Sequence, residues 1–178
     1  MTEVERLIAI EEIKQLKARY FRCMDTKDWD GLESVFAPDA VLDSREAMFA
    51  RDPATGACIQ SGHVVDARAV SDEAWRSVGA ADIRAAIEGA VHPLTTAHCG
   101  HMPEIEITSP TTARGIWAME DVIRYAPGDA LKTLTGYGHY HETYEKADGR
   151  WRIKSLKLTR LRVDVVHAAR HALDSHGG

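Results

Sequence analysis

The segment YHETYEKADGRWRIKSLKL, residues 140–158, contains two strand-like runs separated by Asp148 and Gly149. Alternating runs that carry aromatic and β-branched residues are typical of β-strands. An Asp-Gly pair between two such runs is a strong signal for a tight hairpin turn. The segment therefore predicts an antiparallel hairpin near the end of the chain.

Two further strand-like runs precede this hairpin, so the whole C-terminal half resembles a β-meander. The four runs cover residues 97–108, 112–126, 131–147 and 149–166. In the second run Trp117 and Met119 alternate with Ile116 and Ala118, so both faces look apolar. A sheet with helices on one face and a pocket or oligomer interface on the other gives this pattern.

Three helices are predicted before the meander. A helical spacing of apolar residues runs from Val4 to Met24, with Thr2 and Glu5 as a capping box. A short helix follows at residues 28–36, with Asp28 as its N-cap, and a third covers residues 80–91. Helices followed by long antiparallel strands predict an α+β fold whose curled sheet closes on the long helix.

The domain boundaries follow from length and composition. A chain of 178 residues predicts one domain spanning 1–178. Residues 44–79 have weak periodicity, which leaves a short hairpin, a loop over a cavity or a lid-like insertion open. The tail at 167–178 is expected to form a short helix or to fray.

The bulk composition excludes several classes of protein. The net charge is −5 and no basic run is present, which argues against nucleic-acid binding. No stretch approaches the ~18 apolar residues of a membrane span, and the N-terminus lacks the apolar region of a signal peptide. Three cysteines without CxxC spacing favour a reducing compartment, so we expect a cytoplasmic protein.

The acid at the end of the first helix and a histidine in the first long strand are the main candidates for chemistry. Asp25 lies at a helix C-terminus, where the helix dipole disfavours an acid, so it needs water or a partner. A carboxylate bonded to one ring nitrogen of His98 would make that histidine a general base. The residues alone leave simpler alternatives open: a surface acid for Asp25, a hydrogen-bonded core histidine for His98, and a core tyrosine for Tyr20.

The histidine spacings give only a weak indication of a metal site. In a regular strand His98 and Gly100 share one face while Cys99 and His101 share the other, so a compact site would need a bulge. The pair His139 and His141 shares a face, but its third ligand would have to come from elsewhere. We expect no metal and no cofactor.

Arg160 belongs to the last strand, where alternation places it on one face with Leu156, Leu158 and Arg162. An arginine on a mixed apolar face is either an ion-pair partner or an interface residue in most proteins. A guanidinium aimed at a substrate carbonyl or carboxylate is the functional alternative.

Four segments together resemble the SnoaL-like branch of the nuclear transport factor 2-like superfamily. They are EEIKQLKARYFRCMDTKDWDGLESVFAPDAV (11–41), HCGHMPEIEI (98–107), ARGIWAMED (113–121) and YHETYEKADGRWRI (140–153). The combination of YFRCMD with HxGHxPEI is similar to the bile acid 7α-dehydratases, and more distantly to the scytalone dehydratases and lindane dehydrochlorinases. The resemblance covers about residues 8–163, apart from 44–79, and implies a cone-shaped α+β barrel with three N-terminal helices on a curved, mainly antiparallel sheet.

The resemblance also implies roles for individual residues. His98 corresponds to the general base and Asp25 to the aspartate that orients it. Tyr20 corresponds to a tyrosine that polarises a carbonyl or assists the leaving group, and Arg160 to an arginine near the substrate. Trp117 and Tyr140 would line the cavity, and His101 would either point away from it or support His98.

From these roles we expect a cofactor-independent dehydratase that acts on a hydrophobic hydroxylated carbonyl compound, steroid-like or alicyclic. A double-bond isomerase with the same site, and a non-catalytic module that binds a small molecule, are the alternatives. Because members of the family are usually homo-oligomers, we expect a homodimer or homotrimer. The 44–79 segment is where this chain departs from the family, and substrate specificity often depends on such loops.

Overall fold

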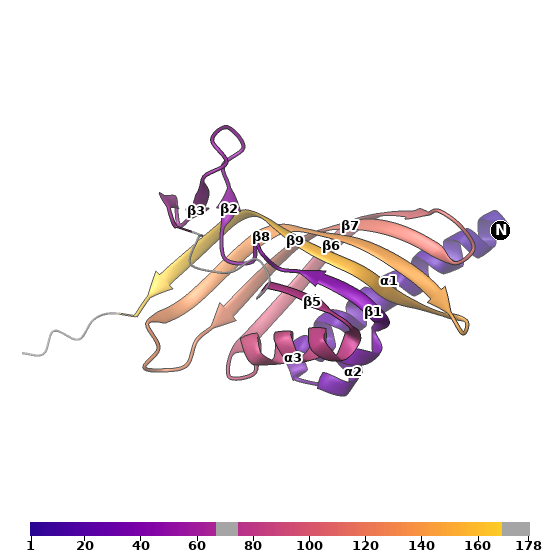
Figure 1. Ribbon diagram of the computed structural model, residues 1–178, viewed down its shortest axis with the longest axis horizontal. Helices are drawn as coiled ribbons and strands as arrows, with labels where there is room; N and C mark the ends of the chain where they lie inside the picture. The colour runs from indigo at the N-terminus through magenta and orange to yellow at the C-terminus, as the bar shows by residue number, and fades with distance from the viewer. Residues whose placement is uncertain (67–74, 169–178) are drawn as a thin grey trace, which may run out of the picture.

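The computed structural model describes residues 1–66 and 75–168 (Figure 1). A six-stranded sheet curves over three helices, which confirms the predicted cone-like α+β fold. The elements are α1 (Glu3–Thr26), α2 (Trp29–Ser34), β1 (Phe36–Asp43), β2 (Ala50–Arg51), β3 (Cys58–Gln60), β4 (His63–Val64), β5 (Arg76–Val78), α3 (Ala80–Val91), β6 (Thr95–Ile107), β7 (Thr112–Arg124), β8 (Leu131–Ala147) and β9 (Arg150–His167).

The long first helix begins and ends with well-formed caps. The Thr2 hydroxyl accepts from the Glu5 backbone N–H, and the Glu5 carboxylate accepts from the Thr2 backbone, so the predicted capping box is present. At the other end Lys27 takes the left-handed conformation, with φ 62°, and its N–H caps the last carbonyls of α1. Asp28 then caps α2, as predicted, by accepting from the Gly31 N–H at 3.0 Å.

The large sheet has the strand order β5-β1-β9-β8-β7-β6, and its last four strands form the predicted antiparallel meander. Only the β1–β9 pair is parallel in the described part of this sheet. The turn between β8 and β9 places Asp148 at φ 53° and Gly149 at φ 73°, as a two-residue hairpin turn with two positive φ angles requires. The Asp-Gly prediction is therefore confirmed.

Two of the β-bulges in the large sheet affect which side chains near His98 and Arg160 face the helices. In β6 the pairing with β7 shifts between Gly100 and Pro103, so His98 and Gly100 precede the bulge and His101 falls within it. In β9 the pairing with β8 shifts between Arg160 and Arg162. The expectation that these two arginines share one face is wrong, because the bulge leaves Arg160 buried and Arg162 exposed.

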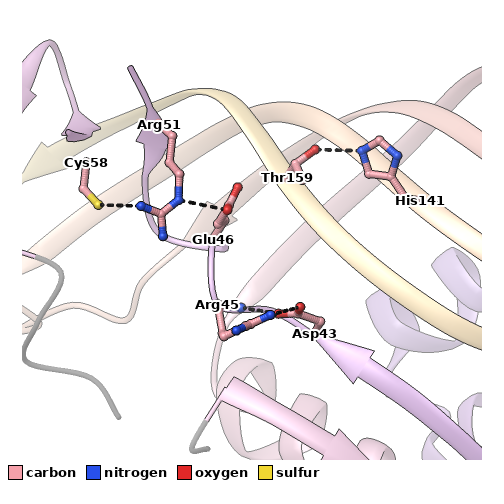
Figure 2. Close-up of polar contacts among 7 residues, drawn as sticks. All are labelled: Asp43, Arg45, Glu46, Arg51, Cys58, His141 and Thr159. Atoms are coloured by element: carbon pink, nitrogen blue, oxygen red, sulfur yellow. Dashed lines mark hydrogen bonds and ion pairs between the residues drawn. The ribbon is translucent and has the colours of Figure 1, made fainter. Parts of the chain in front are cut away.

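The 44–79 segment contains a short hairpin, which was one of the three alternatives. Strands β2, β3 and β4 form a separate small sheet beside the end of β9, and β5 pairs with β1 in the large sheet. Figure 2 shows the polar contacts that hold the start of the segment: Arg45 binds Asp43 at 2.6 Å, and Arg51 binds Glu46 at 3.0 Å. Residues 67–74 and most of the predicted 167–178 tail lie outside the described residues.

Candidate active site

Asp25 lies in the last turn of α1 and accepts three hydrogen bonds from β6. Its Oδ1 accepts from the Thr96 hydroxyl at 2.8 Å and contacts His98 Nδ1 at 2.7 Å. Its Oδ2 accepts from the His98 backbone N–H at 2.9 Å. These donors explain how an acid is tolerated at a helix C-terminus, where the helix dipole opposes it.

The hydrogen bonds also determine the charge of this carboxyl. Partial burial by itself would raise the pKa of Asp25, but the hydrogen bonds from His98 and Thr96 and the interaction with the imidazole outweigh burial and lower it. Asp25 is therefore a carboxylate near neutral pH, and a carboxylate can only accept. The proton of the short bond consequently belongs to His98 Nδ1.

The His98 ring is held by a contact at its Nδ1 edge and by stacking on one face. Asp25 fixes one edge, and the Phe21 ring stacks on its face with ring centroids 6.5 Å apart and an interplanar angle of 12°. Its side chain is 5% exposed. Within the described residues, Nε2 makes no hydrogen bond, so in the neutral ring this nitrogen has a free lone pair. A carboxylate–imidazole pair in this tautomer is suited to accept a proton.

A second polar pair, Asp121 and Arg160, lies on the same inner face of the sheet. Asp121 is the cross-strand neighbour of His98. Its Oδ2 accepts from Arg160 Nη2 at 2.8 Å, and both side chains are 3% exposed. Arg160 Nε also donates to the Ala47 carbonyl at 2.9 Å, which ties the start of the 44–79 segment to the inner face. Arg160 is thus an ion-pair partner in the structure.

The space around this pair is restricted. A Cβ added to Gly136 would lie 2.3 Å from Arg160 Nη1 and 2.5 Å from Asp121 Oδ1, so only glycine fits beside them. Asp121 Oδ1 is buried and has no hydrogen-bond partner among the described residues. A buried carboxylate oxygen without a donor costs free energy. This oxygen is therefore a group that a bound hydroxyl could satisfy.

Tyr20 and Tyr140 fill the region between α1 and the sheet. Their ring centroids are 6.0 Å apart, and both side chains are buried. Burial, followed by the charge of Glu142, raises the pKa of Tyr20 well above its ordinary value, so its hydroxyl stays protonated and can donate. Burial also raises the pKa of Tyr140.

Beneath these rings lies a charged network that the sequence analysis did not single out. The Lys17 ammonium binds the Glu142 carboxylate and lies 3.7 Å from the Tyr140 ring centroid. Glu142 also accepts from the Tyr144 hydroxyl, which in turn accepts from Trp117 Nε1 at 2.7 Å. Trp117 is therefore buried in this network. A lysine on the apolar stripe of the first helix was the signal that could have identified it.

The other predicted site residues lie apart from this group. His101 is exposed within the β6 bulge. His139 and His141 have ring centroids 6.2 Å apart, and His141 Nε2 contacts the Thr159 hydroxyl at 3.0 Å (Figure 2). Across residues 1–66 and 75–168, no three histidine, cysteine or acidic side chains are grouped as metal ligands. An open pocket of about 1240 Å³ lies elsewhere, lined by residues of α1, α2, β1, the start of α3 and the start of β9.

Comparison with known proteins identifies the family. A SnoaL-like domain model matches residues 5–157. The chain belongs to the SnoaL-like domain family. This SnoaL-like protein is 28% identical over 149 residues to the probable cyclase FGR4 of Gibberella zeae, and the match covers 84% of this chain and 89% of that protein.

Solved structures share the fold at lower identity. A candidate scytalone dehydratase from Novosphingobium aromaticivorans superposes with a TM-score of 0.69 at 19% identity, covering 94% of both chains. The hexachlorocyclohexane dehydrochlorinase LinA-type3 from Novosphingobium barchaimii gives 0.66 at 16% identity, covering 95% of this chain and 96% of that one. These likenesses agree with the resemblance to the SnoaL-like branch. The family match and the likeness to the probable cyclase support a small-molecule-converting enzyme.

No α-helix formed by residues 1–66 and 75–168 combines the length and the apolar character that crossing a bilayer requires.

Proposed function

We propose that this SnoaL-like protein is a cofactor-independent dehydratase that acts on a hydrophobic hydroxylated carbonyl compound, steroid-like or alicyclic. The observation that carries the proposal is the 2.7 Å contact between Asp25 Oδ1 and His98 Nδ1, which leaves the Nε2 lone pair to accept a proton. A base of this kind removes a weakly acidic proton next to a carbonyl. We place the protein in the cytoplasm as part of the same proposal.

In the proposed reaction His98 Nε2 takes a proton from the carbon α or vinylogous to the carbonyl. The electrons of the C–H bond move to the carbonyl oxygen, and the Tyr20 hydroxyl or a water donates to the resulting enolate. Asp25 stabilises the imidazolium that forms. The enolate then expels the hydroxyl group as its C–O bond breaks, and His98 returns the proton so that water leaves.

The second polar pair has a supporting role in this proposal. Asp121 Oδ1 is buried and lacks a donor among the described residues, and its carboxylate is held by Arg160. Asp121 and His98 are neighbours across β6 and β7. A substrate hydroxyl that donates to Asp121 Oδ1 would therefore lie beside His98. Arg160 then acts near the substrate by fixing Asp121.

A panel of hydroxylated steroid-like and alicyclic ketones in deuterated buffer tests the proposal. We expect at least one β-hydroxy or vinylogous hydroxy ketone to yield the unsaturated ketone, and His98→Ala to lower the rate by roughly 10²–10⁴-fold. His101→Ala, on the same strand but exposed, is the matched control and should retain the rate. Double-bond migration without loss of water would favour the isomerase, and tight binding without deuterium exchange would favour a binding module.

We also propose that the protein forms a homodimer or homotrimer through the outer face of the sheet. Large apolar side chains are exposed there on β7, β8 and β9: Ile116 and Tyr137 are each 38% exposed and Leu161 is 69% exposed. Contiguous exposed apolar patches mark interfaces, and we propose that these side chains belong to one such patch. In sedimentation, Tyr137→Glu with Leu161→Glu should shift the protein to monomer. Val64→Glu on β4 should not, and an unchanged mass for the double variant would contradict this interface.

A further inference from the structure

We propose that Lys27 is a positioning residue that holds Asp25 charged and directed at His98, and that it acts through the Thr96 hydroxyl. The inference rests on the proposed function, because it assigns Lys27 a task in the same base. It concerns a residue outside the reacting group, just beyond the end of α1.

The donor and acceptor at each hydrogen bond show how Lys27 is linked to Asp25. Lys27 Nζ lies 3.2 Å from Thr96 Oγ1, and an ammonium can only donate. The Thr96 hydroxyl therefore accepts from Lys27 and uses its single proton on Asp25 Oδ1, 2.8 Å away. Oδ1 is the oxygen that contacts His98 Nδ1. A cation is thus connected to the catalytic carboxylate oxygen by one intervening hydroxyl.

The backbone of Lys27 is unfavourable for a lysine. Its φ of 62° and ψ of 29° place it in the left-handed region, which glycine and asparagine adopt more readily at this helix position. The capping bonds to the Cys23 and Met24 carbonyls use the backbone N–H, which any residue except proline would supply. The fold therefore needs a residue here but not a lysine side chain. Strained conformations of this kind gather at functional sites.

The charge of Lys27 is also placed where it affects the base. The side chain is partly buried, and burial lowers its pKa while the charge of Asp25 opposes that change. The other titratable or charged groups near the pair are Tyr20 on α1, whose buried hydroxyl stays neutral, Asp121 on β7, opposite His98, and Arg160 on β9, which binds Asp121. Those two charges offset each other. Loss of the Lys27 cation should therefore make the Asp25–His98 pair easier to protonate.

Two substitutions at Lys27 separate charge from backbone strain. Lys27→Met removes the charge and keeps a side chain in the strained conformation, while Lys27→Gly removes both. We expect the acidic limb of the pH profile of kcat/KM to move upward in both variants, by roughly half a unit to one unit, the effect of one charge a few ångströms away in a partly solvated site. Lys27→Gly should also unfold at a higher urea concentration than the wild type, whereas Lys27→Met should not.

The Thr96→Val variant tests the connection, because valine has nearly the same shape but no hydroxyl. It should move the acidic limb in the same direction as Lys27→Met, and combining the two should add little. Lys14→Met, exposed on the same helix, should leave the limb in place. An unchanged limb in the Lys27 variants of an active enzyme would overturn the inference.

A second readout keeps this test separate from the proposed function. The His98 ring can be followed by NMR during a pH titration of the free protein, without any substrate. If no substrate is turned over but Lys27→Met still displaces the His98 titration upward, the positioning role stands and the dehydratase proposal fails. If the titration curves of wild type, Lys27→Met and Lys27→Gly coincide, Lys27 has no such role.

Discussion

An Asp25→Asn variant is expected to lose roughly 10³–10⁴-fold in kcat while keeping its fold, the size of effect seen when a catalytic histidine is held in the wrong tautomer. The reason is that three groups donate hydrogen bonds to Asp25, and an asparagine side chain cannot accept all three. Asp25 accepts from the Thr96 hydroxyl, the His98 backbone N–H and His98 Nδ1. An asparagine side chain has one acceptor oxygen and an NH₂ group that can only donate.

The NH₂ group of the substituted side chain has to face one of these donors. The backbone N–H of His98 cannot lose its proton, so the amide oxygen stays with it and the NH₂ group turns to the ring. His98 Nδ1 then becomes the acceptor and the proton moves to Nε2. A ring protonated at Nε2 cannot remove a proton from a substrate, although its packing against Phe21 is unchanged.

Steady-state kinetics and ¹⁵N NMR of the His98 ring check this prediction together. The rate should fall and the proton should be found on Nε2, while Asp39→Asn, which changes an exposed acid paired with Lys154, should alter neither. A variant that keeps more than about a tenth of the wild-type kcat would mean that Asp25 does not orient the base.

The acid stability of the same variant gives an independent measurement. The pKa of Asp25 in the folded state is lower than its ordinary value of 3.8. Its ionisation therefore stabilises the fold above that value, and this contribution is lost as the pH falls below it. Asp25→Asn lacks the titrating group, so its free energy of unfolding should decline less than that of the wild type at pH values below about 4.

Local patterns were enough to predict the helices, the meander and the Asp148-Gly149 turn. The capping box at Thr2 and the hairpin signal depend on residues only two or three positions apart. The bulge in β9 could not be predicted in this way, because it is a property of how two strands pair. For that reason strict alternation places Arg162 on the same face as Arg160, which the register shift between them contradicts.

One polar pair of the site could be predicted from the sequence, and the other could not. The Asp25–His98 contact joins residues 73 positions apart, and it was anticipated from the unfavourable location of an acid at a helix end and from the family resemblance. Asp121 gave a weaker signal, since a single acid in an apolar strand also fits an exposed position. Its burial depends on Arg160, which reaches it from β9 across the space beside Gly136. Such a pair becomes visible only when three strands are assembled.

A Lys17→Met variant is expected to destabilise the protein by about 3–5 kcal/mol, the usual result of leaving one member of a buried ion pair without its partner. Lys17 and Glu142 have side chains 1% and 0% exposed. Burial lowers the pKa of Lys17, which shows how unfavourable this environment is for a lone charge. Without the ammonium, the Glu142 carboxylate would retain only the Tyr144 hydroxyl as a donor among the described residues.

Combining Lys17→Met with Glu142→Gln should recover most of that loss, because the pair is then replaced by neutral groups of similar volume. The glutamine oxygen can still accept from Tyr144. A matched control exists in the Lys146–Glu12 pair, which also joins α1 to β8 at 2.8 Å but is 27% and 43% exposed. Lys146→Met should cost no more than about 1 kcal/mol. Urea unfolding measures all three variants, and equal losses for Lys17→Met and Lys146→Met, or no recovery in the double variant, would show that the buried network does not depend on charge compensation.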